Sequence, residues 1–581
     1  MCGIIGYIGG KEASRIVHDG LKILTYRGYD SSGIAVIDEE GINIQKDKGK
    51  LEDINFKIEN LRGNIAIGHN RWGTTGNITQ ENAHPHMSCD ENIAVVHNGI
   101  VENYIELREE LIKKGHSFKS ETDTEVIPHL IEEYSKENNY IDAVKKTIKR
   151  LEGRFAIVVM KKHFDGLIGA RNGSPLVVGE KGEEKFLASD VPAFLNHTKK
   201  VYYLNDDEMV IAGKKLEFYS LKDDRKIERE ANIIDWDAEQ ATKQGYEHYM
   251  IKEIMEQKET IEKAIAIPKE RIMGFADELN KAFGIFFVAC GTAYHAGLTA
   301  SYIFSKFANK HINVVLASEF KHYVDFVTDK TLVIPISQSG ETADVLEAIK
   351  AAKQKGAKII SVLNVIGSSI MRASDDYYMI NAGPEMAVAS TKAFIGQVAL
   401  LTLLANACAG KLEEGKKYLK EISMKINLMF EDRIAEQIKE LANKLKDKKS
   451  LFIIGRGFNY PIAMESALKI KEISYIHAEG FAGGELKHGT LALIEKDVPC
   501  IVFADGKKEI IANAEEIKAR GGYIIGIAEE NNPVFDYFVK VPKSDVILNV
   551  IPAQLIAYYL AVEKGLDPDK PRNLAKVLTV K

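Results

Sequence analysis

The 581-residue sequence predicts a multidomain protein, an α+β layered sandwich followed by two α/β lobes with parallel sheets. A single hydrophobic core stops growing beyond about 250–300 residues, so a chain of this length contains several domains. Strands and helices in the first third do not alternate regularly, which favours separate layers over a doubly wound sheet. The second half repeats a strand, a Gly-rich turn, a helix and a strand, which is typical of parallel sheets.

Apolar runs bounded by Gly and polar turns predict the strands of the N-terminal third. These runs are Ile4–Ile8, Gly33–Ile37, Ile65–Gly68, Ile93–His97, Phe155–Met160, Gly166–Ala170 and Leu176–Val178. Apolar residues at helical spacing predict helices over Val17–Thr25, Tyr104–Lys114, Val126–Tyr134 and Tyr140–Leu151. The charge-dense run 221–231 predicts a solvated connector, so we expect the first domain to span residues 1–230.

An internal duplication predicts the two later lobes, at residues 281–430 and 431–581, after a linker and leading helices at 231–280. The predicted strands of the first lobe are Ile285–Cys290, Leu332–Ile336 and Ile359–Val362. Those of the second are Leu451–Ile454, Cys500–Phe503 and Ile524–Ile527. Ligands of parallel sheets bind where the strands end, so the Gly-rich turns after these strands are the expected binding sites.

Hydroxyl side chains follow one of these strand ends, at Ser337, Ser339 and Thr342. Together with the N–H groups of the following helix they suit a phosphate monoester, and ordinary helix capping is the alternative interpretation. No GxxxxGK[ST] motif is present, so the turn is not a nucleotide P-loop.

Composition excludes several classes of protein. A net charge of −6 gives no electrostatic reason to expect nucleic acid or an anionic membrane as a partner. The five cysteines are far apart and form no CxxC pair, so we expect a reducing compartment, the cytoplasm. His84-Pro85-His86 offers two metal ligands without a third nearby, and we expect no metal site. The apolar run Ala393–Cys408 is too short for a bilayer and predicts a buried helix at a subunit contact.

Cys2 is the first candidate for chemistry. Removal of Met1 would leave Cys2 with a thiol and a free α-amine. The amine has a pKa near ~8, so part of it is unprotonated at neutral pH and can act as a base on the thiol. The alternative is an ordinary chain start that leads into a buried strand.

Five polar clusters and Cys2, in this order, resemble the class II glutamine amidotransferases, whose N-terminal nucleophile lies in a four-layer αββα sandwich. The clusters are Tyr26–Gly33, His69–Gly76, Asn82–His86, His97–Asn103 and Ser120–Glu125. The resemblance implies that Cys2 attacks glutamine and that Asn98 and Gly99 form the oxyanion hole. It further implies glutamine-binding roles for Arg71, Trp72 (also a gate), Thr74, His86 and Asp123; Thr75 stands where the family often has histidine.

The second half resembles a pair of sugar isomerase (SIS) domains, and the whole chain resembles the glutamine–fructose-6-phosphate aminotransferase family. The matching segments are Cys290–Thr292, Ser337–Thr342, Val388–Lys392, Lys469–His488 and Pro571–Lys576. The resemblance implies conversion of fructose 6-phosphate and glutamine to glucosamine 6-phosphate and glutamate, the first step of hexosamine biosynthesis. It implies no cofactor and a homodimer.

The same resemblance implies roles for individual residues. Lys576 would form a Schiff base with the sugar, Glu472 would move the proton from C1 to C2, and Lys469 would stabilise the developing oxyanion. His488, lent across the subunit interface, would open the sugar ring, and Trp72 and Ala575 would line an ammonia channel. Sugar-phosphate contacts would come from Cys290, Gly291, Thr292, Ser337, Gln338, Ser339, Thr342, Val388 and Ser390; Ala293 stands where the family often has serine.

Two other functions are alternatives to this one. A different class II amidotransferase, such as the phosphoribosyl-pyrophosphate enzyme, would need a pyrophosphate-ribose motif, which the sequence lacks. A non-catalytic sugar-phosphate sensor would not need Glu472, His488 and Lys576 together, so their joint presence favours an enzyme.

Overall fold

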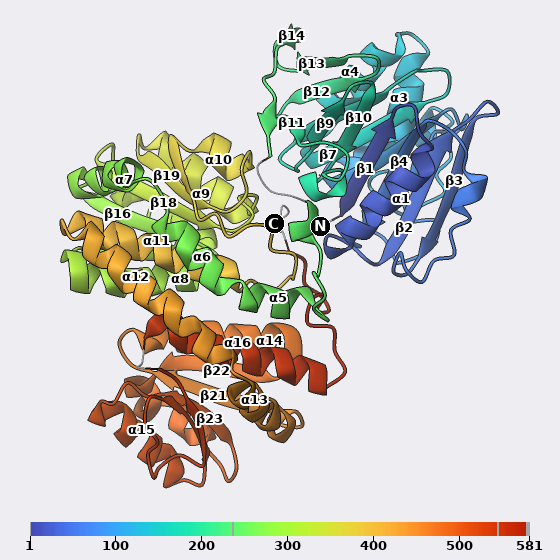
Figure 1. Ribbon diagram of the computed structural model, residues 1–581. Helices are drawn as coiled ribbons and strands as arrows, with labels where there is room; N and C mark the ends of the chain where they lie inside the picture. The colour runs from blue at the N-terminus through green and yellow to red at the C-terminus, as the bar shows by residue number, and fades with distance from the viewer. Residues whose placement is uncertain (1, 235–237, 543–544, 577–581) are drawn as a thin grey trace. The chain divides into compact units, whose positions relative to one another are not determined.

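A computed structural model describes residues 2–234, 238–542 and 545–576. It divides into two compact units, Met1–Ala241 with Ala575–Lys581, and Thr242–Leu574 (Figure 1).

In the described part of the first unit, the strands form two antiparallel sheets. One sheet runs in the order β15 (Asn232–Ile233), β11 (Lys200–Tyr203), β9 (Val177–Lys181), β10 (Glu184–Ala188), β1 (Gly3–Ile8), β4 (Ile65–Arg71), β2 (Ser31–Ile37) and β3 (Ile42–Lys48). The other runs β14 (Arg225–Ile227), β13 (Leu216–Ser220), β12 (Glu208–Ala212), β8 (Leu167–Asn172), β7 (Gly153–Lys161), β6 (Ile93–Val101) and β5 (His86–Met87).

These sheets are the two inner layers of an αββα sandwich, as predicted. Side chains alternate between the two faces of a strand. On β6, Ala94 and Val96 therefore pack against the other sheet, whereas Ile93 and Val95 pack against helices. Helix α1 (Ala13–Ile23) covers the first sheet. The second sheet is covered by α2 (Tyr104–Lys113), α3 (Val126–Ser135) and α4 (Tyr140–Arg150).

The prediction of a solvated connector at 221–231 was wrong in part. Within this run, residues 225–227 form β14 at the outer edge of one sheet; residues 232–233, just beyond the run, form β15 at the outer edge of the other. An edge strand exposes one side and tolerates charged side chains, so a charge-dense run can still be strand. The first unit accordingly continues to Ala241, past the predicted end at residue 230.

In the second unit, the described strands form two parallel sheets with the same strand order, which confirms the predicted pair of α/β lobes. The first sheet is β17 (Asn313–Leu316), β16 (Gly284–Ala289), β18 (Thr331–Ser337), β19 (Lys358–Leu363) and β20 (Asp376–Met379). The second is β22 (His477–Ala482), β21 (Ser450–Gly455), β23 (Pro499–Phe503), β24 (Tyr523–Ala528) and β25 (Tyr537–Lys540). The predicted boundary between the lobes at residue 430 stays a prediction.

Helices surround both parallel sheets, and one core cluster includes side chains from both lobes. These helices are α5 (Tyr249–Met255), α6 (Gln257–Ile265), α7 (Lys269–Lys281), α8 (Gly291–Ile303), α9 (Ala343–Gln354), α10 (Ser369–Ala373), α11 (Lys392–Cys408), α12 (Leu412–Ile426), α13 (Asp432–Leu445), α14 (Asn459–Ser474), α15 (Lys508–Lys518) and α16 (Val546–Glu563).

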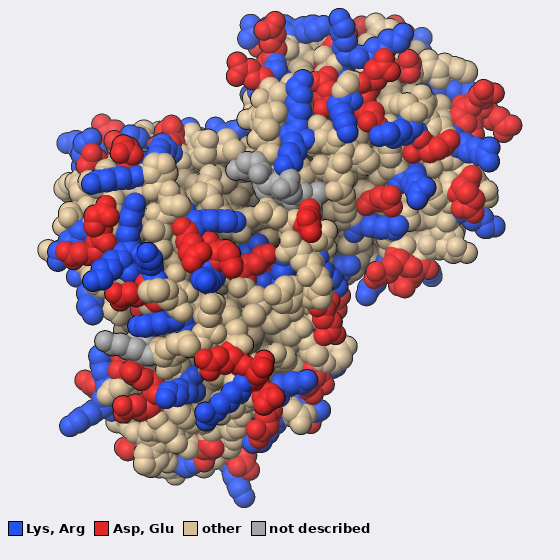
Figure 2. Space-filling model, in the orientation of Figure 1, with Lys and Arg blue, Asp and Glu red and all other residues tan. Residues whose placement is uncertain are grey.

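Helix α11 is buried along almost its whole length, as its apolar run predicted. It packs against α6, α7, α8 and α12 of the same chain, so the expectation that it lies at a subunit contact was wrong. A helix that is apolar all round is stable in the centre of a large core. Within the described residues, no helix combines the length and apolarity needed to cross a membrane. On the face drawn in Figure 2, positive and negative side chains are interspersed.

Candidate active site

Cys2 lies directly before β1, a strand flanked by β4 and β10 in its sheet. Its Sγ atom accepts a hydrogen bond from the backbone N–H of Trp72 at 3.1 Å, and Trp72 directly follows β4. Burial raises the pKa of the Cys2 thiol, while the Trp72 N–H acts in the opposite direction. A thiol held protonated in this way needs a nearby base before it can act as a nucleophile.

Asn98 faces Cys2 from the second sheet, on β6. Its Nδ2 donates to the Cys2 carbonyl oxygen at 2.9 Å, and its Oδ1 lies 3.1 Å from Nε2 of His69. That Nε2 also lies 2.9 Å from the His97 carbonyl oxygen. Because the His97 carbonyl oxygen can only accept a hydrogen bond, Nε2 of His69 carries the ring proton. The Asn98 atom beside this nitrogen is therefore the acceptor Oδ1, and the Asn98 NH₂ group faces Cys2. Burial lowers the pKa of His69 to about 3, so the ring is neutral.

Gly99 has φ +121°, a left-handed conformation that side chains rarely adopt. A Cβ atom there would lie 1.8 Å from the Arg154 carbonyl oxygen. Both features require glycine at the position predicted to supply the backbone N–H of the oxyanion hole.

We expect Gly99→Ala to lower the free energy of unfolding of the first unit by at least about 2 kcal/mol. The new Cβ atom would clash with the Arg154 carbonyl oxygen, and alanine would have to adopt a φ angle that is strained for it. Glutamine hydrolysis should fall with it, since the Gly99 N–H would shift. Thermal unfolding and glutamate release measure the two effects. Gly10→Ala is the control, because a Cβ atom at Gly10 meets nothing within 4 Å. Unchanged melting and hydrolysis in Gly99→Ala would contradict the argument.

Arg71 and Asp123 both lie close enough to Cys2 for their charges to influence the pKa of its thiol. The buried Arg71 guanidinium donates to the carbonyl oxygens of Thr75, Gly76 and Asn77, so it holds the loop after β4. Asp123 Oδ2 accepts the Val101 N–H at 2.8 Å. A buried cation and a buried anion beside one thiol suit the α-carboxylate and α-ammonium of an amino acid.

The remaining predicted glutamine contacts differ in their surroundings. The Trp72 ring meets the Tyr29 ring edge-on, with centroids 5.3 Å apart, and Thr74 is exposed. His86 is buried on β5, with Nε2 3.1 Å from Thr122 Oγ1. It lines a cavity of about 670 Å³ that is not lined by Cys2, Arg71 or Asp123. The glutamine-binding role of His86 stays a prediction.

In the second unit, the turn after β18 gathers the predicted phosphate-binding hydroxyls. Ser337 Oγ lies 3.4 Å from Thr342 Oγ1 and accepts the Gly340 N–H at 3.0 Å. Thr342 is the N-cap residue of α9, yet its side chain makes no capping hydrogen bond. Its partly buried hydroxyl is therefore not used for capping, which favours the phosphate interpretation over the alternative.

The other predicted sugar-phosphate residues surround neighbouring strand ends of the same lobe. Cys290 follows β16 as the N-cap residue of α8, Gly291 and Thr292 are the first residues of that helix, and Gln338 follows β18. Ser390 Oγ donates to the buried Glu385 at 2.7 Å. The Val388 N–H donates to the carbonyl oxygen of Asp569, which lies in the C-terminal tail.

A chain of polar side chains, buried or partly buried, connects the two lobes. Lys469 on α14 is fully buried, and its Nζ lies 2.5 Å from Glu472 and 3.5 Å from Glu465. Glu465 Oε2 lies 2.8 Å from Nδ1 of His295 on α8. Burial opposes the charge on Lys469, but Glu472 and Glu465 outweigh it and raise the pKa of the lysine. Lys469 is therefore held by ion pairs with two carboxylates, and Glu465 also contacts His295.

Glu465 and His295 were missed by the sequence analysis. Glu465 stands four residues before Lys469 on the same helix, a spacing that could have suggested an ion pair. His295 comes from another helix far away in the sequence, and no sequence pattern indicates its contact with Glu465.

The C-terminal tail is anchored in the second unit as far as Leu574. Asp569 accepts the N–H groups of Tyr249 and Met250, each at 2.8 Å, at the start of α5. The Arg572 N–H donates to the Tyr475 hydroxyl at the end of α14, the helix that carries Glu472. Ala575 and Lys576 are partly buried and group with the first unit. His488 ends the short 3₁₀ helix η9 (Gly483–His488) and is exposed.

Comparisons with known proteins agree with this arrangement. A glutamine amidotransferase domain model matches residues 69–196, and an SIS domain model matches residues 278–407 and 444–564. A protein of Clostridium acetobutylicum named glutamine–fructose-6-phosphate aminotransferase [isomerizing] is 46% identical, with both chains covered completely. A protein of Thermococcus kodakarensis with the same name is also 46% identical over the whole of both chains.

Among solved structures, the C-terminal domain of glucosamine-fructose-6-phosphate aminotransferase from Francisella tularensis is 36% identical, with a TM-score of 0.52. The match covers 57% of this chain and 100% of that domain.

Proposed function

We propose a two-site mechanism for this chain, which belongs to the glutamine–fructose-6-phosphate aminotransferase (isomerizing) family, as relatives that match over its full length establish. The reaction converts D-fructose 6-phosphate and L-glutamine to D-glucosamine 6-phosphate and L-glutamate, the first step of hexosamine biosynthesis. The role of each residue rests on the resemblance of its motif to that family, and the geometry of the two sites supports several of these roles.

The first site releases ammonia from glutamine. Arg71 binds the α-carboxylate of glutamine in a bidentate pair and Asp123 binds its α-ammonium. After removal of Met1, the α-amine of Cys2 accepts the thiol proton, and the thiolate attacks the side-chain amide. The Asn98 NH₂ group and the Gly99 N–H stabilise the oxyanion that forms, and the orientation of Asn98 toward Cys2 supports this role. When this intermediate collapses, its C–N bond breaks, the protonated α-amine of Cys2 returns its proton to the departing nitrogen, and ammonia leaves behind a thioester. Water then hydrolyses the thioester, which releases glutamate and restores the Cys2 thiol.

The second site accepts the nitrogen on the sugar. The hydroxyls of Ser337, Ser339 and Thr342 and the N–H groups at the start of α9 bind the phosphate. Lys576 condenses with the C2 carbonyl of the open-chain sugar and is displaced by ammonia. Glu472 then moves a proton from C1 to C2, while Lys469 stabilises the negative charge on the sugar oxygen. Trp72 and Ala575 contribute to an ammonia path.

The observation that carries this proposal is the fully buried Lys469 between Glu472 and Glu465. Burying a lysine costs free energy, and a protein that only bound a sugar phosphate would not need a charged relay beside the sugar. The direct test mixes the protein with glutamine and fructose 6-phosphate. We expect glucosamine 6-phosphate and glutamate in equal amounts, whereas a sensor would give no aminated sugar.

His488 is proposed to open the sugar ring in the active site of a second subunit, in a homodimer located in the cytoplasm. His488 is exposed on its own chain, and Leu493, five residues later, has 57% of its surface exposed. An exposed leucine beside an exposed catalytic histidine suits a contact with a partner copy.

Subunit mixing tests this arrangement. We expect His488→Asn and Glu472→Gln each to lose sugar amination as homodimers. After the two variants are mixed and allowed to exchange subunits, half of the dimers carry one intact site, which restores about a quarter of wild-type activity. If His488 serves its own chain, every site keeps a defect and the mixture stays inactive.

A further inference from the structure

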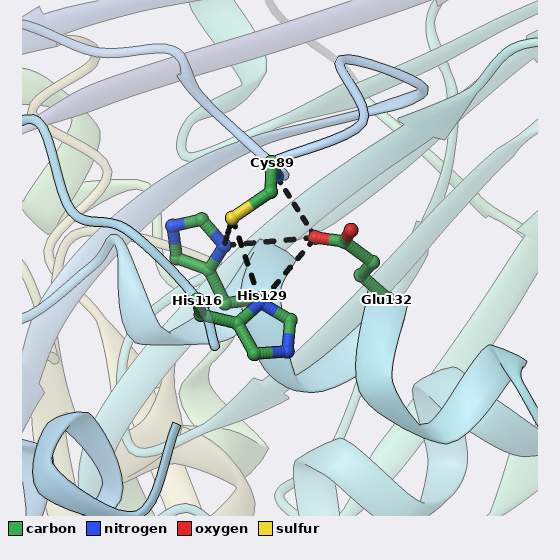
Figure 3. Close-up of side chains that lie close together, drawn as sticks. All are labelled: Cys89, His116, His129 and Glu132. Carbon is green, nitrogen blue, oxygen red and sulfur yellow. Dashed lines mark hydrogen bonds and ion pairs between the residues drawn. The ribbon is translucent and has the colours of Figure 1, made fainter. Parts of the chain in front are cut away.

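Four side chains with metal-binding atoms converge on one face of the first unit (Figure 3). Cys89 lies in the turn between β5 and β6, His116 follows α2, and His129 and Glu132 lie on α3. Their donor atoms all lie within 4.8 Å of one another. None of these residues has a role in the proposed reaction.

Four of the six distances between the donor atoms of this cluster are close to those around a tetrahedral zinc ion. Cys89 Sγ lies 3.6 Å from His116 Nδ1 and 3.4 Å from His129 Nδ1. Glu132 Oε2 lies 3.5 Å from His116 Nδ1 and 3.7 Å from His129 Nδ1. Zinc bonds of ordinary length at tetrahedral angles place neighbouring ligand atoms about 3.3–3.6 Å apart. The other two pairs of donor atoms, Cys89 with Glu132 and His116 with His129, lie within 4.8 Å, so binding an ion requires at most a local closing of the side chains.

The surroundings supply the outer contacts that metal ligands require. His116 Nε2 lies 3.2 Å from a carboxylate oxygen of Glu133, and His129 Nε2 lies 3.6 Å from one of Glu125. A carboxylate behind a histidine directs the other ring nitrogen toward the metal. The Ser117 N–H donates to Cys89 Sγ at 3.4 Å, which holds the sulfur atom facing the two histidines.

Charge also favours a cation here. Glu125, Glu132 and Glu133 surround two largely buried imidazoles. With Cys89 ionised, the cluster would carry an excess of negative charge that a divalent ion balances. The ion can enter from solvent, because Cys89 is exposed and, with His129, lines the cavity of about 670 Å³.

We propose that Cys89, His116, His129 and Glu132 bind one structural zinc ion. Sulfur and imidazole ligands select zinc over magnesium or calcium, and four protein ligands leave no open position for catalysis. The ion would join the β5–β6 turn to the segment before α3, which carries Asp123. It would therefore stabilise one wall of the glutamine site without taking part in the chemistry.

The test uses the full-length protein. We expect about one zinc ion per chain after purification, measured by mass spectrometry of the metals. Removing zinc with a chelator should raise hydrogen exchange in residues 88–92 and 114–132. Cobalt added to the metal-free protein should give the intense visible bands of tetrahedral cobalt and a thiolate-to-cobalt charge-transfer band. These readouts do not depend on enzymatic activity.

Variants locate the site. Cys89→Ser should remove the charge-transfer band, and His129→Gln should weaken zinc binding about tenfold or more. Glu91→Gln is the matched control, because Glu91 is exposed on the same turn and outside the cluster; it should bind zinc like the wild type. The proposal is overturned if metal-free wild type takes up no zinc at micromolar concentrations, or if Cys89→Ser and His129→Gln bind it normally. If the variants do not fold, the absence of a tetrahedral thiolate spectrum in wild type with cobalt overturns it equally.

Discussion

Replacing Cys2 with alanine is expected to lower glutamine hydrolysis by about 10⁴-fold or more, because no other group can form the thioester intermediate. Alanine keeps the small side chain that allows Met1 to be removed, so the new chain start is comparable. Isomerisation of fructose 6-phosphate should remain measurable, since the Glu472–Lys469 pair lies in the other unit. Glutamate release and sugar-phosphate isomerisation are followed separately on the same sample.

Cys408→Ala is the control for this substitution, because Cys408 is a partly buried thiol on α11 with no proposed role. Mass spectrometry of the wild-type chain tests the starting condition, the free α-amine of Cys2. Loss of both activities in a folded Cys2→Ala protein would contradict two separate sites. Full glutaminase activity in a chain that keeps Met1 would contradict the α-amine as the base.

Glu472→Gln should lower sugar isomerisation by about 10²- to 10⁴-fold, because glutamine has nearly the same shape but cannot accept the C1 proton. Lys469 keeps its other carboxylate partner, Glu465 at 3.5 Å, so the buried lysine is not left unpaired. Glutamine hydrolysis should continue. Exchange of the C1 hydrogen of fructose 6-phosphate with deuterated solvent measures the proton transfer directly.

Lys471→Gln is the matched control, since Lys471 is exposed on the same turn of α14 and should leave the exchange rate unchanged. A Glu472→Gln protein whose exchange rate stays within tenfold of wild type would show that another group moves the proton. Glu465 would then be the next candidate, because it contacts Lys469, Thr292 and His295.

Many elements could be predicted because they follow from local patterns. The three central strands of each later sheet are short apolar runs, and their observed bounds lie within one residue of the predicted ones, whereas the edge strands β17, β20, β22 and β25 were not predicted. The central strands are buried on both faces, so almost every residue must be apolar and the signal is strong. The edge strand β3 was missed, because its sequence INIQKDK is largely polar and partly exposed.

The amino-acid sequence alone determined the family, the order of the domains and the motifs that carry Cys2, Asn98 and Lys469, because these depend on residues close together along the chain. Only the tertiary structure decided the partners that come from distant segments: His295 beside Glu465, and Cys89 beside His116 and His129. Such contacts depend on how helices and strands pack. One-dimensional periodicity records which face of an element is buried but not which side chain it meets there.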